Sequence, residues 1–318
     1  MRKLIITKRE TKFENQILDC TNKTVATIVS QYSKNEIHFI ELYQIGISKW
    51  DEIKRNFSEK NIQKSGALII RQEILNYTLK MESKKLELER LQNEVVEYYK
   101  KLGDEIGIVL GYKIFYSKFS GNADILFIGI NPGAGEQIQY TGEEIMLEYI
   151  NDSTNEDGCQ INNYALAKET LKVFELADYP NLLKKLDAEN KVVKINSIFY
   201  IDTKNSEGEN VKIGDFITTI LTKAQKDDFY RKSYDWTYKL IQLINPKIII
   251  CEGKTAYYNL YESIPEVEIK KDESNGTLVT KYDKLAFTML MYNRNYSYID
   301  DKEYFAEILK IELDKIYK

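Results

Sequence analysis

The sequence has few of the residues that most often build metal and nucleophile sites. Its 318 residues contain three cysteines, Cys20, Cys159 and Cys251, and one histidine, His38. The cysteines lie far apart with no CxxC pair, whereas structural zinc and iron–sulfur sites need about four soft ligands close together. The lone histidine lies in a strand-like apolar segment, where an ordinary, partly buried ring is the simplest interpretation. We therefore expect a site without metal, cofactor or histidine chemistry.

Long apolar runs and an excess of basic residues are also missing. No run approaches the roughly 18 apolar residues that span a bilayer, and the apolar stretch near the N-terminus is too short for a signal peptide. We therefore expect a cytoplasmic protein with no membrane partner. The formal charge of −4 disfavours a protein that coats nucleic acid non-specifically, although it permits a local basic groove. The apolar fraction of 43% is sufficient for a sizeable core.

The N-terminal part of the chain predicts an extension made of two different segments. Alternating apolar and polar residues in KLIIT, KTVATIVSQY and EIHFIELYQIGI predict short strands. Residues 51–102 then predict a long helix. Its apolar residues recur every seven positions at Ile74, Met81, Leu88 and Val95. Such a seam packs on another helix, either within this chain or across a homodimer formed through residues 66–102, and the pattern leaves both open.

The remainder of the chain predicts a three-layer α/β/α sandwich with a short, mainly parallel four-stranded sheet. Near-continuous apolar runs are typical of strands buried on both faces, and helical patterns separate them. The strands are expected at 124–130, 192–200, 247–252 and 284–291, and the helices at 162–176, 213–244, 254–263 and 302–317. Glycines at 103–123 place the boundary near residue 105, so that an extension of residues 1–104 precedes a domain of residues 105–318.

One loop carries most of the functional argument. After the strand ADILFIGI the chain continues with Asn131, Pro132, Gly133, Ala134, Gly135 and Glu136. Ligands of parallel sheets bind beyond the carboxyl ends of strands, and glycines allow backbone amides to approach them closely. Asn131 adds an amide that can hold a water molecule. The spacing fits neither GxGxxG nor a Walker loop, which leaves a plain structural turn as the alternative.

ILFIGINPG resembles the first active-site motif of the uracil-DNA glycosylase superfamily, most of all its mismatch-specific uracil/thymine branch, whose motif also reads GINPG. Three further segments resemble the superfamily in the same order: NNYALAKETLKVFELADYP, VVKINSIFY and NPKIIICEGKTAYYNL. The resemblance covers roughly residues 105–318. It departs at the second motif, where the chain reads LMYNRNYSY and no proline follows Asn293. A non-catalytic nucleic-acid or base-binding module with the same fold is therefore the alternative to an enzyme.

The resemblance implies a monofunctional DNA glycosylase, which hydrolyses the N-glycosidic bond of a flipped-out base and leaves an abasic site. Asn131 would orient the attacking water, with Glu136 as an alternative general base. The base would contact Gly129, Ile130, Pro132, Gly133, Tyr140 and Asn196. Double- or single-stranded DNA would contact Lys254, Asn293 and Arg294. No cofactor is implied.

The segment that follows the loop is acidic. Between Lys118 and Lys168 there are eight aspartates and glutamates and no lysine or arginine, together with Tyr140, Tyr149 and Tyr164. It is either a solvated insertion that faces away from DNA, or a pocket whose carboxylates and tyrosines bind a hydroxyl-rich adduct on the base. The second interpretation points to glucosylated hydroxymethylcytosine in phage DNA and to antiviral defence. Phosphate contacts could then come from the basic and aromatic residues at 223–239.

Overall fold

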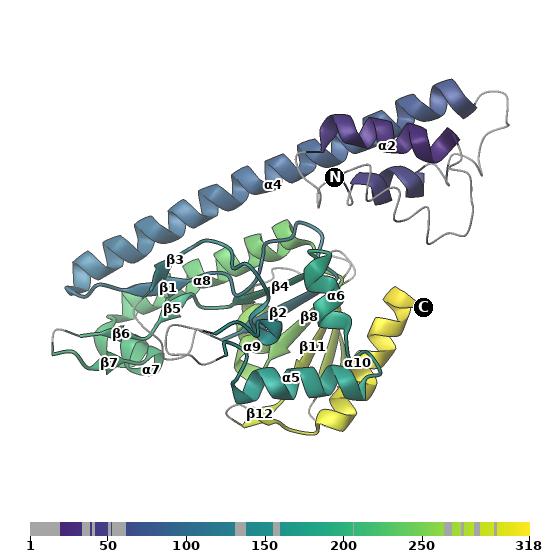
Figure 1. The fold of residues 1–318 in the computed structure, drawn as a ribbon. Helices are drawn as coiled ribbons and strands as arrows, with labels where there is room; N and C mark the ends of the chain where they lie inside the picture. Colours follow the sequence, from purple (N-terminus) through teal and green to yellow (C-terminus); the bar gives the residue numbers. More distant parts are fainter. Residues whose placement is uncertain are drawn as a thin grey trace. The chain divides into compact units, whose positions relative to one another are not determined.

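The computed structural model divides the chain into two compact units, Met1–Leu86 and Glu87–Lys318. The boundary falls within α4 (Ile62–Ile106), the longest helix (Figure 1). The structure describes residues 20–33, 39, 42–49, 52, 62–130, 138–154, 160–205, 207–263, 269–274, 277–282, 287–295 and 298–318. Within these ranges no helix has both the length and the apolar character needed to cross a membrane.

The first unit is helical in its described residues. The segment KTVATIVSQY lies in α2 (Cys20–Tyr32), and residues 42–49 are helical as well. The expected strands are therefore wrong at these two places. The reason is packing, because the apolar residues fall on one helix face and meet α4. The buried residues of this cluster are Val25, Ala26, Ile28, Val29, Phe39, Leu42, Ile70 and Ile74. KLIIT and His38 lie outside the described residues.

The second unit is a three-layer α/β/α sandwich, as the sequence predicts (Figure 1). Its sheet has the order β4-β2-β8-β11-β10-β9, and the first four of these strands are parallel to one another. They are β4 (Val192–Asn196), β2 (Ile125–Gly129), β8 (Ile248–Glu252) and β11 (Phe287–Tyr292). A hairpin that the sequence did not predict, β9 (Ile269–Ser274) and β10 (Thr277–Tyr282), extends the sheet with antiparallel strands.

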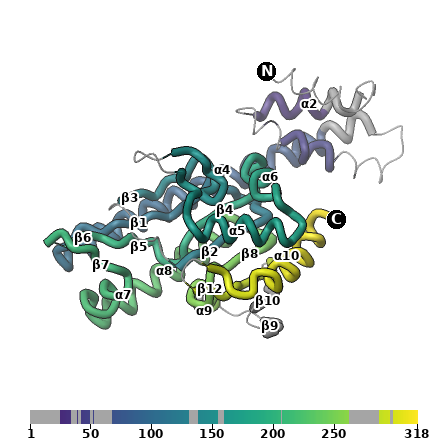
Figure 2. The backbone as a smooth tube through the Cα atoms, turned by 60° about the horizontal axis from the view of Figure 1, so that its bottom comes forward, coloured from purple at the N-terminus to yellow at the C-terminus, as the bar shows by residue number. Residues whose placement is uncertain are grey.

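Helices cover both faces of the sheet, which explains why its central strands are apolar throughout. α5 (Ala165–Leu176), α6 (Leu182–Ala188) and α10 (Lys302–Tyr317) pack on one face. α5 and α10 run side by side there (Figure 2). The C-terminal half of α4, α8 (Lys223–Ile244) and α9 (Lys254–Ser263) pack on the other face. Successive residues of β2 alternate between the two cores, as the strand periodicity requires.

Smaller elements surround the carboxyl edge of the sheet. β1 (Gly111–Lys113) pairs with β3 (Gln139–Tyr140) and β5 (Tyr200–Ile201) in a second sheet. The 3₁₀-helix η1 (Glu148–Ile150) precedes α5. The remaining elements are β6 (Thr203–Lys204), β7 (Asn210–Val211), α7 (Ile213–Asp215), the π-helix η2 (Phe216–Ile220), β12 (Arg294–Asn295) and β13 (Tyr298–Ile299).

The apolar residues that recur every seven positions in α4 are divided between the two units. Ile74 is buried in the core of the first unit, and Leu88 and Val95 are buried in the core of the second. Tyr98, one turn further on, packs edge-on against Trp236 of α8 with ring centroids 5.3 Å apart. The units therefore separate at residues 86/87 rather than near residue 105, because the last turns of α4 belong to the sandwich. This packing favours the intramolecular interpretation of the seam over a homodimer.

Adjacent valines in α4 test this assignment. Val95 is fully buried in the second unit, whereas Val96 is 37% exposed. Val95→Ala should lower the free energy of unfolding by roughly 2 kcal/mol, because it removes packed methyl groups and leaves a cavity. Val96→Ala, the matched control, should change it by less than about 0.5 kcal/mol. Urea unfolding of the full chain measures both, and equal effects would contradict the assignment.

Candidate functional site

The strand order locates the candidate site at the carboxyl edge of the parallel strands. From β2 the chain crosses to β4 on one side, and it later enters β8 on the other side of β2. Ligands of open α/β sheets bind outside the carboxyl ends of strands where the order reverses in this way. The reversal lies between β2 and β8, which end at Gly129 and Glu252. The GINPG loop and Gly253 follow these two ends directly.

Two polar side chains converge on Gly129 at this edge. Gly129 is paired with Asn196 of the neighbouring strand, and both Asn196 and Glu252 are buried. A methyl group added to Gly129 would lie 2.0 Å from Asn196 Oδ1 and 3.0 Å from Glu252 Oε2. Only glycine leaves room for both oxygens, so the glycine of the motif has a packing reason as well as a conformational one.

A buried lysine lies next to this pair. Lys194 precedes Asn196 by two residues in β4, so both side chains are on the same face of the sheet. The Lys194 ammonium is 2.6 Å from Glu252 Oε1 and 3.2 Å from Glu148 Oε1, and it also donates to the Tyr149 hydroxyl. Burial lowers the pKa of Lys194 to about 8, and the Glu148 carboxylate opposes this fall. Burying an ammonium costs several kcal/mol unless it is paired and hydrogen-bonded, and these acceptors supply both.

The two carboxylate oxygens of Glu252 have different surroundings. Oε1 accepts from Lys194, which leaves Oε2 facing Gly129 and Asn196. Burial raises the pKa of Glu252, while the positive charge of Arg294 opposes the rise and Glu148 adds to it. The Lys194 ammonium favours the charged form of Glu252 as well, since opposite charges at this distance stabilise each other.

Buried hydroxyl groups surround the two carboxylates. Tyr116 and Tyr164 are neutral donors, because burial and the nearby Glu148 charge raise the pKa of each. Burial, with the charge of Glu252, also raises the pKa of Tyr292. In the described structure these three hydroxyls and Asn293 Oδ1 are buried without a hydrogen-bond partner of normal geometry. Buried polar groups are usually paired with protein, water or ligand. Here the three hydroxyls lie close to Asn196, Glu148 and Thr170, respectively, so they line the site beside its carboxylates.

Backbone hydrogen bonds fix both ends of the predicted active-site loop. Ile130 O accepts from Ile198 N at 2.9 Å and from Ser197 Oγ at 3.1 Å. At the other end Ile138 O accepts from Tyr112 N at 2.7 Å. The loop residues 131–137 lie outside the described residues. The roles expected for Asn131, Pro132, Gly133 and Glu136 therefore stay predictions.

The residues expected to contact DNA gather at the end of β8. Gly253 has a φ of +106°, a backbone conformation that favours glycine. If Gly253 carried a Cβ atom, that atom would lie 3.5 Å from Arg294 Nε. Lys254 follows as the exposed first residue of α9. Asn293, immediately before Arg294, is partly buried. Arg294 and Lys254 are thus close together beside Glu252.

Tyr140 occupies a different place from the other residues expected to bind the base. It lies in β3, is 38% exposed, and its hydroxyl donates to the backbone oxygen of Glu143 at 2.8 Å. No described contact joins it to Asn196 or Glu252. The interaction instead closes a local turn.

The acidic segment has two kinds of carboxylate. Glu143 accepts from Phe119 N at 2.9 Å and Glu144 pairs with Lys113 at 2.5 Å, so these two hold the segment on the sandwich. Glu148 and Tyr149 reach Lys194 at the candidate site. Two carboxylates of the segment thus hold it on the sandwich and one lies at the candidate site, and both interpretations of the segment stay predictions.

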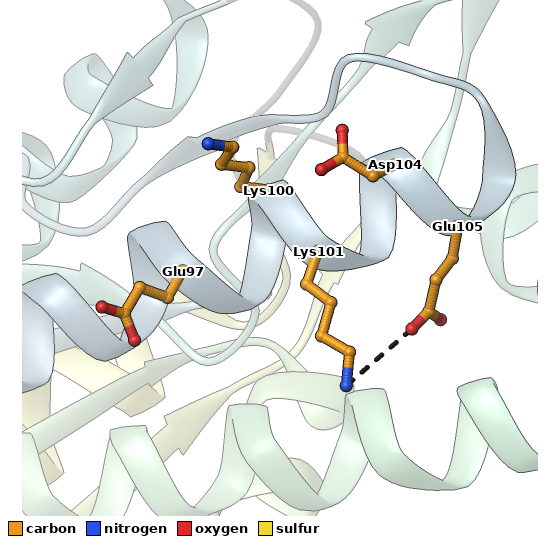
Figure 3. A pocket seen from close by; sticks show the side chains of 5 residues that line it. All are labelled: Glu97, Lys100, Lys101, Asp104 and Glu105. Atoms are coloured by element: carbon orange, nitrogen blue, oxygen red, sulfur yellow. Dashed lines mark ion pairs between the residues drawn. The ribbon is translucent and has the colours of Figure 1, made fainter.

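The basic and aromatic residues of α8 do not form the expected free surface. Phe229 and Trp236 are buried in the core. Lys232 and Lys239 pair with Glu94 of α4 at 2.7 and 3.3 Å. A surface hollow on α4 also lacks the features of a site, since its side chains have mixed charge and come from one helix (Figure 3). They are Glu97, Lys100, Lys101, Asp104 and Glu105.

Sequence reasoning missed the ion pair of Lys194 and Glu252, although both residues carry a signal. Lys194 is the one charged residue of VVKIN, and Glu252 ends the apolar run IIIC. A charge inside a strand buried on both faces needs a partner. Searching the ends of the neighbouring strands for that partner would have found the pair.

Comparison with known proteins gives no family for this chain, since neither a protein-family model nor a curated protein matches it.

Replacing Lys194 tests how much its positive charge stabilises the buried carboxylates. Lys194→Met is expected to lower the free energy of unfolding by about 3–5 kcal/mol at neutral pH, because Glu252 loses its partner. Without the ammonium, the folded-state pKa of Glu252 lies above its unfolded value of about 4.3, so the loss grows as the pH rises above that value and is small near it. Chemical denaturation over a pH series measures this.

The matched control is Lys310→Met, because Lys310 pairs with Asp178 on the surface. It should cost less than about 1 kcal/mol at any pH. A Lys194→Met variant as stable as the wild type at neutral pH would contradict the pairing.

Proposed function

We propose that this chain is a DNA base glycosylase, which hydrolyses the N-glycosidic bond of a flipped-out base and leaves an abasic site. The observation that carries the proposal is the convergence of Asn196 and Glu252 on Gly129 at the reversal of the strand order. The GINPG loop, which resembles the uracil-DNA glycosylase motif, starts from this point. The residues proposed to bind the base therefore lie where the proposed catalytic loop begins.

The chemistry divides between these two parts. Cleavage of the bond leaves positive charge on the sugar and negative charge on the departing base, so the enzyme must stabilise both. The Asn196 amide and the unpaired buried hydroxyls can bond to the edge of the base. Asn131 orients the water from a loop whose start, Ile130, is fixed by two hydrogen bonds. Such catalysis depends on positioning more than on a strong base.

Arg294 and Lys254 supply the contacts with DNA in this proposal. Both lie beside the end of β8, and a guanidinium is suited to clamp a phosphate or to insert into a duplex. The acidic and tyrosine-bearing wall of Glu148, Tyr149 and Tyr164 favours a base with a hydroxyl-rich adduct. Glucosylated phage DNA carries such a base, which would make the chain an antiviral enzyme.

Base release from defined DNA tests the proposal. The full chain should produce abasic sites in glucosylated phage DNA, scored by alkaline cleavage. Asn131→Ala should lower the rate by about 100-fold or more while DNA binding persists. Asn181→Ala is the matched control, since Asn181 is exposed and its side chain makes no capping hydrogen bond.

Two outcomes would overturn parts of this proposal. Binding without release from any DNA would favour the alternative of a non-catalytic base-binding module, which the missing proline after Asn293 also supports. Release of uracil alone would reject the modified base as the substrate.

A further inference from the structure

The position of the second Glu252 oxygen, Oε2, limits which ligand edge can lie at the candidate site. Glu252 Oε1 is occupied by Lys194, and Oε2 points toward Gly129, where Asn196 Oδ1 also points. An ionised carboxylate has acceptors only, and the amide oxygen is an acceptor too. Two acceptors facing the same place call for a donor on the ligand.

The charges around Glu252 support the ionised form. The groups that face it are Lys194 from β4, Glu148 from η1, Arg294 from β12, and the tyrosines Tyr116 and Tyr292. Lys194 and Arg294 balance the charges of Glu148 and Glu252. The ammonium at 2.6 Å also holds Oε1, so the carboxylate cannot rotate to present another atom.

A second observation points to a ligand in the same place. The Tyr292 hydroxyl belongs to a residue that is 1% exposed and pairs directly with Glu252 in the sheet. This hydroxyl lies close to Thr170 and that of Tyr116 lies close to Asn196, but neither makes a hydrogen bond of normal geometry within the described structure. Polar atoms left unpaired in a core are destabilising unless a bound molecule or water satisfies them.

Nucleobases differ in the group they would present here. Cytosine and adenine carry an exocyclic amino group, which donates hydrogen bonds, where uracil, thymine and hypoxanthine carry a carbonyl, which accepts them. A carbonyl placed against Oε2 would face another acceptor and leave both buried and unpaired.

We infer that Glu252 is the specificity-determining residue of the site, and that the base it accepts carries an amino group facing Oε2, as cytosine- and adenine-type bases do. Lys194 is its positioning residue. The inference rests on the proposed function, and it names the substrate class within that function.

Matched base pairs test it directly. DNA containing 5-hydroxymethylcytosine is compared with DNA containing 5-hydroxymethyluracil, and adenine is compared with hypoxanthine. Within each pair the amino group is replaced by a carbonyl, and the adjacent ring nitrogen changes from an acceptor to an N–H donor. At neutral pH, where the Lys194 ammonium 2.6 Å away favours the ionised carboxylate, the wild type should favour the amino-bearing member by about 10-fold or more in kcat/KM. In Glu252→Gln the side-chain amide oxygen can still accept from Lys194. The amide NH₂ then takes the place of Oε2 and donates toward Gly129. That variant should favour the carbonyl-bearing member.

A pH series on the wild type gives a readout that needs no variant. Burial raises the pKa of Glu252, so lowering the pH from about 7 to about 5 should add a proton to this group before ordinary carboxyl groups are protonated, which turns an acceptor into a donor. The preference for the amino-bearing base should shrink over this range in the wild type and stay constant in Glu252→Gln. Glu169→Gln is the matched control, because Glu169 pairs with Lys302 at the same 2.6 Å away from the site. It should leave the preference unchanged.

Equilibrium binding of the same DNAs separates the inference from the proposed function. No base release combined with an amino preference in binding, reversed by Glu252→Gln, would reject the enzyme and support the inference. Release or binding that prefers the carbonyl-bearing member at neutral pH, or that Glu252→Gln does not alter, would overturn the inference. A thermal melt of each variant confirms that it is folded.

Discussion

The burial of one ammonium group within the sheet is the constraint on which the site depends. Lys194 lies in a strand covered on both faces, where a charge is tolerated only with close partners. Its three partners come from two parts of the chain, namely Glu252 at the end of β8 and Glu148 and Tyr149 at η1. The ion pair therefore joins β4 to β8 across the central strand β2. It also holds Oε1 of Glu252, so that Oε2 is the oxygen that faces Gly129.

The sandwich could be predicted because its strands are short apolar runs separated by helical patterns. α9 and α10 begin and end at the residues that the pattern predicts, Lys254–Ser263 and Lys302–Tyr317. The N-terminal segments were mistaken for strands, since β-branched residues such as Val25 and Ile28 favour strands locally. Their packing on α4 decides in favour of helix, and a partner so distant in sequence is not visible in a local pattern. The polar hairpin of β9 and β10 gave no apolar signal.

The candidate site could be predicted only where a residue ends a strand. Gly129 and Asn196 end neighbouring strands, so their proximity follows from the parallel topology. The pairing of Lys194 with Glu252 joins residues 58 positions apart, and it depends on the strand order, which sequence reasoning did not establish. The division of the acidic segment was equally hidden, because Glu144 and Glu148 differ only in which lysine they meet in the fold.

The predicted active-site loop, residues 131–137, is bordered on both sides by residues that are hydrogen-bonded to the sandwich. Ile130 and Ile138, which border the loop, are held through their backbone oxygens, so these hydrogen bonds do not depend on the side chains at positions 130 and 138. The donors belong to Ser197, Ile198 and Tyr112, which are part of the sandwich. The donors that anchor both ends therefore lie outside the loop, and its sequence can be changed without altering them. Under the proposed function, a loop of different sequence could be placed between these two residues to change the chemistry, while Asn196 and Glu252 would keep their positions.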